Sequence, residues 1–348
     1  MAGSVTLSNV AEHAGVSLAT ASRALNGSTR TVNAELRERV LESAAALGYS
    51  ANAQAQAVAK GTSNIVAVVV GDIADPYFSA IVSGVVGVAE GRGLIVTIST
   101  TGSDDERGLA TVRALKGQRP RALIIAGTRR RDESSRARLT HELTAVEKLG
   151  GRVCVIGSAS VEGGTAPNGF SVVPIRNRES AGRLAEALIA RGYRDFCVLA
   201  GDPGLVTPAE RASGFADAAR DAGIPILESR IVTSEFSRNG AVSALRALLN
   251  RGERPDCIFA VTDVMAVGAM AVLREFGLEP GTDIGVAGFD DIANLQDVTP
   301  SLTTVGLPLA EIGARALEVA LGDVIPEEMQ AVEGLIVLRD STPGRRTV

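Results

Sequence analysis

Hydrophobic residues in the first fifty positions recur at helical spacing, in three short runs separated by turn residues. The pattern predicts three helices, each with a polar capping residue at its start. The expected caps are Ser8 for a helix that stops at Gly15, Ser17 for a helix over 18–25, and Asn33 for a helix that stops at Gly48. A helix, a tight turn and a capped second helix form a helix-turn-helix unit, whose second helix enters the major groove of DNA.

From residue 65 onward, apolar runs rich in β-branched residues alternate with amphipathic stretches. The runs predict buried strands at 65–70, 94–99, 122–126, 153–156, 196–200, 258–261 and 284–288. The amphipathic stretches predict helices at 79–92, 180–191, 209–222, 241–249 and 265–276. Such alternation is typical of parallel sheets covered by helices on both faces, so we expect a doubly wound α/β core. Ligands bind beyond the carboxyl ends of such strands, which here are followed by residues 72–78, 201–211, 262–263 and 289–291.

The composition fits a globular protein. The chain has 348 residues, 45% of them hydrophobic, and no run approaches the 18 to 20 uncharged apolar residues of a membrane span. The first ten residues do not read as a signal peptide, so we expect a cytoplasmic protein with no membrane partner. Cys154, Cys197 and Cys257 lie far apart in strand-like runs, and we interpret them as buried thiols rather than metal ligands or nucleophiles.

The charge restricts how this protein can bind nucleic acid. The net charge is −5, which argues against non-specific coating of DNA or RNA. Residues 1–61 carry five lysine and arginine side chains against four glutamates, whereas the rest of the chain is acidic. Any contact with DNA must therefore depend on the placement of a few residues rather than on bulk charge.

Seven motifs occur in an order that resembles the lactose-repressor/galactose-repressor family of bacterial transcription regulators, over essentially the whole chain. They are Val-Thr-Leu-Ser-Asn-Val-Ala-Glu-His-Ala-Gly-Val-Ser (5–17), Thr-Ala-Ser-Arg-Ala-Leu-Asn-Gly (20–27), Asp-Pro-Tyr-Phe (75–78), Glu-Arg-Ala-Ser-Gly-Phe (210–215), Gly-Phe-Asp-Asp (288–291), Leu-Thr-Thr-Val (302–305) and Arg-Asp-Ser-Thr (339–342). Each motif alone is a weak signal, and their shared order is what makes the resemblance specific.

The resemblance implies a domain organisation. It implies an all-α headpiece at 1–50, a hinge helix and linker at 51–64, and a core at 65–348 that is similar to periplasmic binding proteins. The core is expected to have an N-lobe (about 65–175 and 309–333) and a C-lobe (about 176–305 and 335–348). The chain would cross between the lobes near 175, 305–309 and 332–335. The resemblance further implies a homodimer that represses from a near-palindromic operator, and with no heptad repeat after residue 342 we expect no tetramer.

The resemblance also identifies candidate DNA-contacting residues. Leu18 and Ala19 stand where family members read bases, and their side chains permit only apolar contacts such as packing on a thymine methyl. Arg23 can reach a guanine edge or a phosphate, and the sequence leaves both open. The remaining candidates in the headpiece are Thr6, Ser17, Thr20, Ser22 and Asn26. The short hydroxyl residues among them can donate to phosphates, although Thr20 and Ser22 equally suit a cap or a turn.

Residues 52–60 are alanine-rich, with Asn52 as a cap and Gly61 as a stop. An isolated helix this short is marginal in water, so we expect it to fold only against its dimer mate on DNA. The resemblance implies that Val58 replaces a leucine wedged into the minor groove, and that Gln56 stands where many members have arginine. A shorter wedge puts a full kink of the operator in question, and a flexible linker is the alternative.

A small-molecule effector, by default a carbohydrate or a derivative of one, is the second partner that the resemblance implies. It implies that Arg211 contacts the ligand and that Asp290 accepts hydrogen bonds from ligand hydroxyl groups. The alternative is that the two residues form an ion pair with each other. Aromatic faces suit the apolar face of a sugar or a base, and core packing is their alternative role. The expected effector residues are Asp75, Tyr77, Phe78, Arg211, Phe236, Thr262, Phe289 and Asp290.

The chain departs from sugar-responsive relatives in three positions. Thr262 and Leu307 stand where an amide is frequent, and Arg176 stands where an aspartate is usual. The loss of two amides predicts a less polar pocket. The run Arg129-Arg130-Arg131 is compatible with an anionic ligand, but we interpret it as a solvated loop.

Two other classes of protein compete with a regulator. An enzyme is disfavoured because the phosphate-loop, dinucleotide, zinc-protease and nucleophile-elbow motifs are absent and the only histidines are His13 and His141. We therefore expect no catalysis, no cofactor and no metal. A periplasmic solute-binding protein would fit the core alone, but the capped three-helix pattern at 1–61 argues against it.

Overall fold

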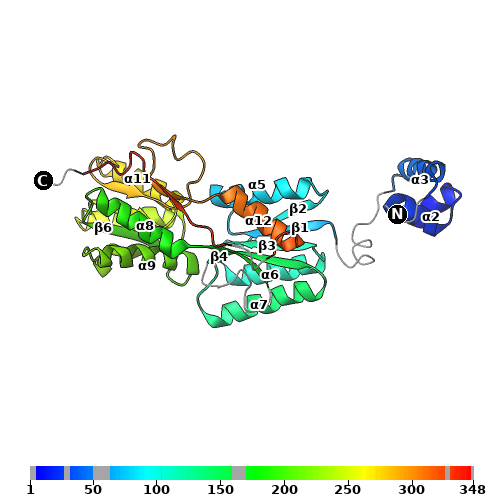
Figure 1. The fold of residues 1–348 in the computed structure, drawn as a ribbon, viewed down its shortest axis with the longest axis horizontal. Coiled ribbons are helices and arrows are strands. Elements are labelled where there is room, and N and C mark those ends of the chain that lie inside the picture. Colours follow the sequence, from blue (N-terminus) through cyan, green and yellow to red (C-terminus); the bar gives the residue numbers. More distant parts are fainter. Residues whose placement is uncertain are drawn as a thin grey trace. The chain divides into compact units, whose positions relative to one another are not determined.

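The computed structural model describes residues 5–26, 32–49, 63–102, 104–158, 170–325 and 330–345. Its contacts divide the chain into two compact units, Met1–Ser63 and Asn64–Val348. The first unit contains the predicted headpiece and the second corresponds to the predicted core, and each is described by itself. Figure 1 shows their elements coloured along the sequence.

The headpiece contains the three expected helices, α1 (Leu7–His13), α2 (Leu18–Asn26) and α3 (Ala34–Ala46). Val10, Ala21 and Val40, one from each helix, are fully buried in a common cluster. The cluster is small, and Arg39 reinforces it by donating from Nε to the carbonyl of Ala14 at 3.0 Å. The helices are thus held by apolar residues at helical spacing and by the hydrogen bond from Arg39.

Two of the three predicted helix caps are confirmed. Ser17 accepts a hydrogen bond from the amide of Thr20, and Asn33 accepts one from the amide of Glu35. The prediction for Ser8 is wrong because α1 begins earlier. Thr6 caps it, and its hydroxyl accepts from the amide of Asn9 while the Asn9 side chain accepts from the amide of Thr6. Such reciprocal capping satisfies two amides that a cap at Ser8 would leave open.

The N-lobe is built on a five-stranded parallel sheet in the order β2-β1-β3-β4-β5. Its strands are β1 (Ile65–Val70), β2 (Ile95–Thr100), β3 (Ala122–Ala126), β4 (Arg152–Ser158) and β5 (Ser171–Ile175). Its helices are α5 (Pro76–Glu90), α6 (Asp105–Gly117), α7 (Glu133–Lys148) and α12 (Leu309–Leu321).

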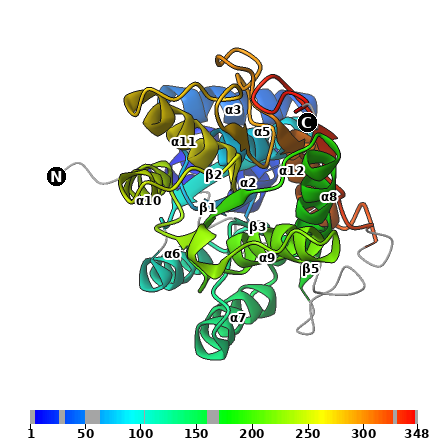
Figure 2. The ribbon, with the colours of Figure 1, turned by 90° about the vertical axis from the view of Figure 1, so that its left-hand side faces the viewer.

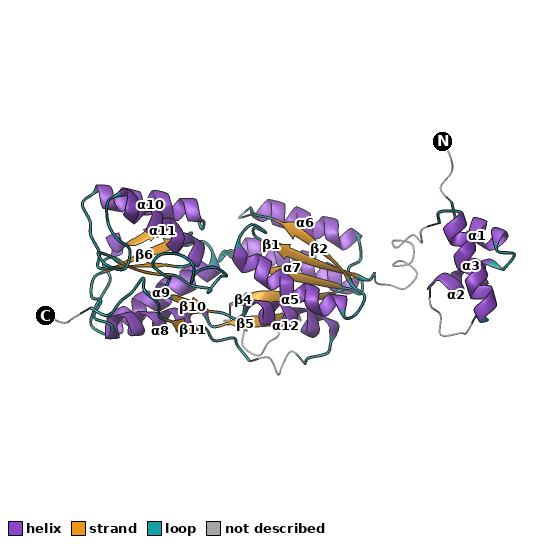
Figure 3. Ribbon diagram, turned by 90° about the horizontal axis from the view of Figure 1, so that it is seen from above, coloured by secondary structure: helices purple, strands orange, loops and turns teal. Residues whose placement is uncertain are grey.

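Successive side chains of β1 enter opposite helical layers, because neighbouring residues of a strand point to opposite faces of the sheet. Val68 belongs to a cluster with Ile81 of α5 and Ile312 of α12. Val69 belongs to a second cluster, with Val112 of α6. Figure 3 shows the strands with helices on either side. A strand buried on both faces is continuously apolar, which is why β1 was recognisable in the sequence.

The C-lobe contains a four-stranded parallel sheet in the order β7-β6-β8-β9. Its strands are β6 (Phe196–Gly201), β7 (Ile231–Thr233), β8 (Cys257–Ala260) and β9 (Gly285–Ala287). Helices α8 (Asn177–Ala190) and α9 (Val206–Asp221) pack against each other, as do α10 (Arg238–Asn250) and α11 (Asp263–Glu275). Figure 2 shows the two helix pairs on different sides of this lobe. The fold class predicted from the alternating pattern is confirmed in both lobes.

The lobes are joined where distant parts of the chain run together. The amide of Val332 donates to the carbonyl of Pro174, and the amide of Arg176 donates to the carbonyl of Val332. Nearby, β10 (Thr304–Gly306) and β11 (Leu335–Val337) form an antiparallel pair. In Figure 1, α12 lies beside α5 in the N-lobe although it follows the C-lobe in sequence. Segments that are far apart in sequence thus join the two lobes.

The sequence did not predict the strands β5, β7, β10 and β11 or the helices α6, α7 and α12. Pro174 interrupts the run of β5, and proline is tolerated there because β5 is an edge strand of its sheet. The other three strands have only three residues each, too few to show an alternating pattern. Predicted helices also began two or three residues late, as at α5 and α9, because polar or proline residues in the first turn hide a helix start.

Candidate functional site

The outward face of α2 presents the residues predicted to read DNA. Leu18 has 52% of its surface exposed, and Ala19 and Arg23 are also exposed. On the opposite face of the same helix, Ala21 and Ala24 are buried against the headpiece cluster. Ala21 and Ala24 therefore pack α2 against the headpiece. Leu18, Ala19 and Arg23 remain exposed on its other face.

The hydroxyl residues of the headpiece have partners within it. Thr6 caps α1, and the Ser17 hydroxyl lies 2.8 Å from the hydroxyl of Thr20. Ser22 is partly buried and already takes part in an interaction within the protein. Asn26 is the last residue of α2. The hinge candidates Asn52, Gln56 and Val58 lie outside the described residues.

A cavity of about 1770 Å³ opens in the core at the carboxyl ends of strands from both lobes. The N-lobe lines it after β1 and β3, and the C-lobe lines it after β6 and β8. Four of the eight predicted effector residues line it, namely Asp75, Phe78, Phe236 and Thr262. The other four, Tyr77, Arg211, Phe289 and Asp290, do not line the cavity, and three of these are almost fully buried.

Two of the lining residues also start helices. Asp75 caps α5 by accepting from the amide of Tyr77 at 2.9 Å, and burial raises the pKa of its carboxyl. Thr262 caps α11 by accepting from the amide of Met265. Caps at the carboxyl ends of strands therefore place one carboxylate and one hydroxyl residue at the cavity wall.

Arg211 is the centre of a buried polar cluster behind the cavity. Its Nε donates to Oδ1 of Asn177 at 2.9 Å, and its Nη1 donates to the carbonyl of Val261 at 2.9 Å. Its Nη2 lies 2.8 Å from Oδ1 of Asp290, and its guanidinium stacks 3.8 Å from the centroid of the Phe289 ring. The pairing that the sequence left open as an alternative is thus present. A role of these residues in ligand contact stays a prediction.

Asp290 occupies an unusual backbone position. Its φ is 122°, and that of Asp291 is 53°, in regions that residues other than glycine rarely adopt. Burial raises the pKa of the Asp290 carboxyl, and Arg211 opposes this rise. Burial and the nearby Asp290 charge also raise the pKa of Tyr77. Strained residues of this kind persist only where the surroundings hold them, which marks this loop as a candidate site.

Asp263, which was not among the predicted site residues, holds the loop that carries Asp290. Its Oδ2 accepts from the amide of Ile292 at 3.0 Å, and its Oδ1 accepts from the hydroxyl of Thr304 at 2.6 Å. Burial raises the pKa of Asp263 to about 7. Asn177, which orients Arg211, was missed as well. The sequence signal for Asp263 was a polar residue next to the end of a predicted strand, whereas Asn177 follows β5, which the sequence did not predict.

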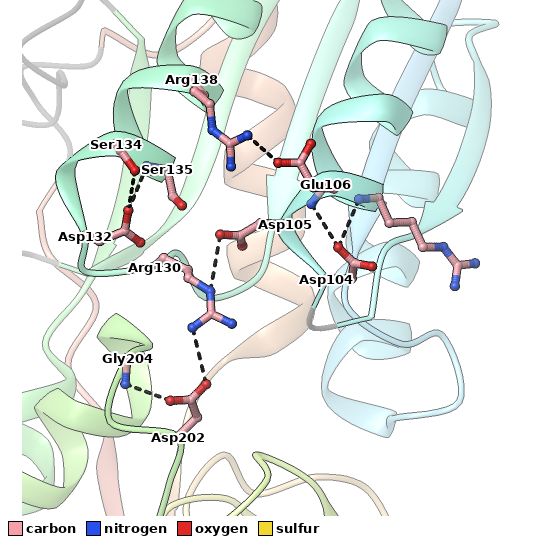
Figure 4. A network of polar contacts seen from close by, with 11 residues as sticks. Asp104, Asp105, Glu106, Arg130, Asp132, Ser134, Ser135, Arg138, Asp202 and Gly204 are labelled. Carbon is pink, nitrogen blue, oxygen red and sulfur yellow. Dashed lines mark hydrogen bonds and ion pairs between the residues drawn. The ribbon is translucent and has the colours of Figure 1, made fainter.

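Loops from the two lobes are bonded to each other at the edge of the cavity. We call residues 128–131 and 202–207 with their contacts the inter-lobe bridge. The amide of Arg131 donates to the carbonyl of Gly204, and the amide of Val206 donates to the carbonyl of Arg129, both at 2.9 Å. Figure 4 shows Arg130 between Asp105 of the N-lobe and Asp202 of the C-lobe, at 3.2 and 3.5 Å. The interpretation of the arginine run as a solvated loop is therefore wrong for Arg130.

The sequence also led to predictions about the three cysteines, about metal ligands and about membrane-spanning helices. Cys154, Cys197 and Cys257 are buried, and burial raises the pKa of each thiol, as expected of packing residues. The described ranges contain no group of three or more His, Cys, Asp or Glu side chains that could hold a metal ion. No helix among the described residues is long and apolar enough to cross a membrane.

A three-helix headpiece with an exposed second helix, followed by a two-lobed parallel α/β core, defines a class of DNA-binding transcription regulators. The family model described as bacterial regulatory proteins, lacI family, matches residues 6–52. A second model, described as a periplasmic binding protein-like domain, matches residues 185–342. The chain belongs to the lacI family of bacterial regulatory proteins. The family predicted from the seven motifs is confirmed, and the protein is a transcription regulator and not an enzyme.

Individual relatives agree with this assignment. The transcriptional regulator GalS of Salmonella typhimurium strain LT2 is 33% identical over 318 residues, which cover 91% of this chain and 89% of GalS. The structure of the lac repressor dimer bound to operator and the anti-inducer ONPF has a TM-score of 0.79 at 27% identity, covering 98% of this chain and 100% of that one. The structure of the transcriptional regulator CelR with cellobiose has a TM-score of 0.68 at 26% identity, covering 97% and 99%.

Proposed function

We propose that this protein is a cytoplasmic repressor that binds a near-palindromic operator as a homodimer. In the proposal, α2 of each headpiece enters the major groove, and residues 52–60 of the two chains form hinge helices against each other on DNA. A small molecule in the cavity of the core changes the affinity for the operator. The effector is a carbohydrate or a derivative of one.

The observation that carries this proposal is the cavity between the two lobes. A ligand that contacts both lobes binds one lobe arrangement better than another, and only such a difference can shift the affinity for DNA. The cavity has a volume of about 1770 Å³ in all, which includes space along α6 and α7 of the N-lobe and exceeds the roughly 300–1,000 Å³ of most small-molecule sites. A ligand of disaccharide size can be accommodated.

The side chains at the wall support a carbohydrate. Phe78 and Phe236 supply apolar surface, while Asp75 and Thr262 supply a carboxylate and a hydroxyl that can bond sugar hydroxyl groups. The structural relative CelR is described in complex with cellobiose. The other four predicted effector residues lie behind the cavity wall. We propose that a change of lobe arrangement exposes them to the ligand, namely Tyr77, Arg211, Phe289 and Asp290.

The DNA part of the proposal rests on the exposed face of α2. Arg23 is its one described basic side chain, while Leu18 and Ala19 offer only apolar contact to bases. Thr6, Ser17, Thr20, Ser22 and Asn26 are proposed to face the DNA backbone. Asn52, Gln56 and Val58 are proposed to contact the minor groove. The lac repressor relative is described as a dimer bound to operator.

Two measurements test this function. Selection of bound sequences from a random DNA pool should yield a near-palindrome, and sedimentation at micromolar concentration should give a dimer. Fluorescence anisotropy on the selected DNA, repeated with a panel of sugars and sugar derivatives, should find a compound that shifts the dissociation constant at least fivefold. A stable tetramer, a non-palindromic site, or a core ligand with no influence on DNA affinity would contradict the proposal.

A further inference from the structure

Arg129 is placed in the cavity by the inter-lobe bridge. Its carbonyl accepts from the amide of Val206, so its backbone is clamped between the lobes while Arg130 points to Asp105 and Asp202. The Arg129 side chain lines the cavity and is partly buried. Its Nη2 lies 3.8 Å from the position that a Cβ on Gly157 would occupy, so the guanidinium lies beside the end of β4.

Most arginines at this cavity have either a carboxylate partner or open access to water. Arg130 pairs with two aspartates, Arg138 with Glu106, and Arg178 with Asp217. Arg131, Arg136 and Arg238 are exposed. Among the described residues, Arg129 alone lines the cavity as a partly buried guanidinium that has neither a side-chain hydrogen bond nor a carboxylate within 4.0 Å.

The described charges around Arg129 do not form an ion pair with it. Glu210 is the acidic group that acts on Arg129, but its carboxylate accepts from the hydroxyl of Ser158, and burial raises the pKa of Glu210. Arg136 faces the same space with a like charge, and burial together with that charge lowers the pKa of Arg129. A guanidinium withdrawn from water without an anion is unfavourable, and proteins generally pair such a group.

We propose that Arg129 and Arg136 form an anion subsite of the effector cavity, and that the effector carries a carboxylate or a phosphate monoester. This inference rests on the proposed function of the cavity. An oxyanion between the two guanidinium groups would supply the missing counter-charge, and arginine binds both anions through two parallel hydrogen bonds. Phe78 and Phe236 then hold the apolar part of the same ligand. A sugar acid or a sugar phosphate has this combination of groups.

The test uses inorganic phosphate, acetate and chloride as probes on the full-length protein. At equal ionic strength, phosphate or acetate should raise the melting temperature of the core by roughly 2 to 4 °C relative to chloride. Arg129→Gln should abolish this rise. Arg138→Gln is the matched control, because Arg138 lines the same cavity but is paired with Glu106, and it should keep the rise. Phosphate against acetate distinguishes the two anions.

The inference is overturned if all three anions give one melting temperature, if Arg129→Gln keeps the rise, or if Arg138→Gln loses it equally. A second arm separates the inference from the proposed function, using operator anisotropy with D-glucose, D-gluconate and D-glucose 6-phosphate. If only the neutral sugar changes DNA affinity, and equally in wild type and Arg129→Gln, the cavity is an effector site but not an anionic one. If the anion effect depends on Arg129 while no DNA is bound specifically, the subsite stands and the repressor function fails.

Discussion

The Nη2 atom of Arg211 lies 2.8 Å from Oδ1 of Asp290, and the two side chains are only 2% and 3% exposed. The neighbouring pair of Arg339 and Asp291 has the same separation, but its side chains are 18% and 28% exposed. Two adjacent aspartates thus make ion pairs of equal length in different surroundings. A comparison of the two pairs therefore isolates the influence of burial on the contribution of each pair to the free energy of unfolding.

Asp290→Ala should lower the free energy of unfolding of the core by about 3–5 kcal/mol, because Arg211 would remain buried without its counter-charge. Asp291→Ala is the matched control and should lower it by about 1 kcal/mol or less, since water reaches Arg339. Urea unfolding followed by circular dichroism measures both. Equal losses in the two variants would show that burial does not set the importance of the Arg211 pair.

The pH dependence of stability should change in Asp263→Asn. The pKa of this carboxyl is raised from 3.8 to about 7. Between pH 4 and pH 7 the carboxyl is therefore protonated in the folded protein and ionised in the unfolded chain. Its contribution therefore favours folding below pH 4 and is lost as the pH rises towards 7, by up to about 1.4 kcal/mol per pH unit. An asparagine can accept from Ile292 and donate to Thr304 without the charge.

Unfolding free energies of wild type and Asp263→Asn should therefore converge at low pH, with the variant the more stable at pH 8. The measurement is urea unfolding at pH 4, 6 and 8. A constant difference between the two proteins across this range would mean that Asp263 does not titrate there.

Arg130→Ala should loosen the inter-lobe bridge. Both ion pairs of Arg130 are partly exposed and individually weak, but together they join Asp105 to Asp202 across the cavity edge. Hydrogen exchange of the Arg131 and Val206 amides should become about threefold to tenfold faster. Arg138→Ala, which breaks a pair within the N-lobe, should leave these amides unchanged. Unaltered exchange in Arg130→Ala would show that the backbone bonds alone hold the bridge.

Arg23→Ala should distinguish base reading from backbone contact. If Arg23 contacts a guanine edge, the variant loses about 1–3 kcal/mol of binding to the selected operator and much less to random DNA. Anisotropy titrations on both DNAs at one salt concentration measure the difference. Equal losses on the two would assign Arg23 to a phosphate.

The sequence by itself determined the elements whose patterns are local. A strand such as β1, buried on both faces, is apolar at every position, and caps such as Ser17 and Asn33 act within two or three residues of themselves. These features predicted the three-helix headpiece, the doubly wound core and the order of the family motifs. The choice of Thr6 over Ser8 was the exception, because two overlapping polar residues offered alternative starts for one helix.

Only the tertiary structure decided which of the candidate residues face the cavity. Arg211 and Asp290 both follow predicted strands, yet burial and pairing place them behind the wall that Asp75 and Phe236 form. Within one run of three arginines, Arg130 joins two lobes while Arg129 enters the cavity with no ion-pair partner in the described part of the chain. A side chain's partner depends on segments distant in sequence, here Asp105 and Asp202, and no local pattern records which of them the fold brings within a few ångströms.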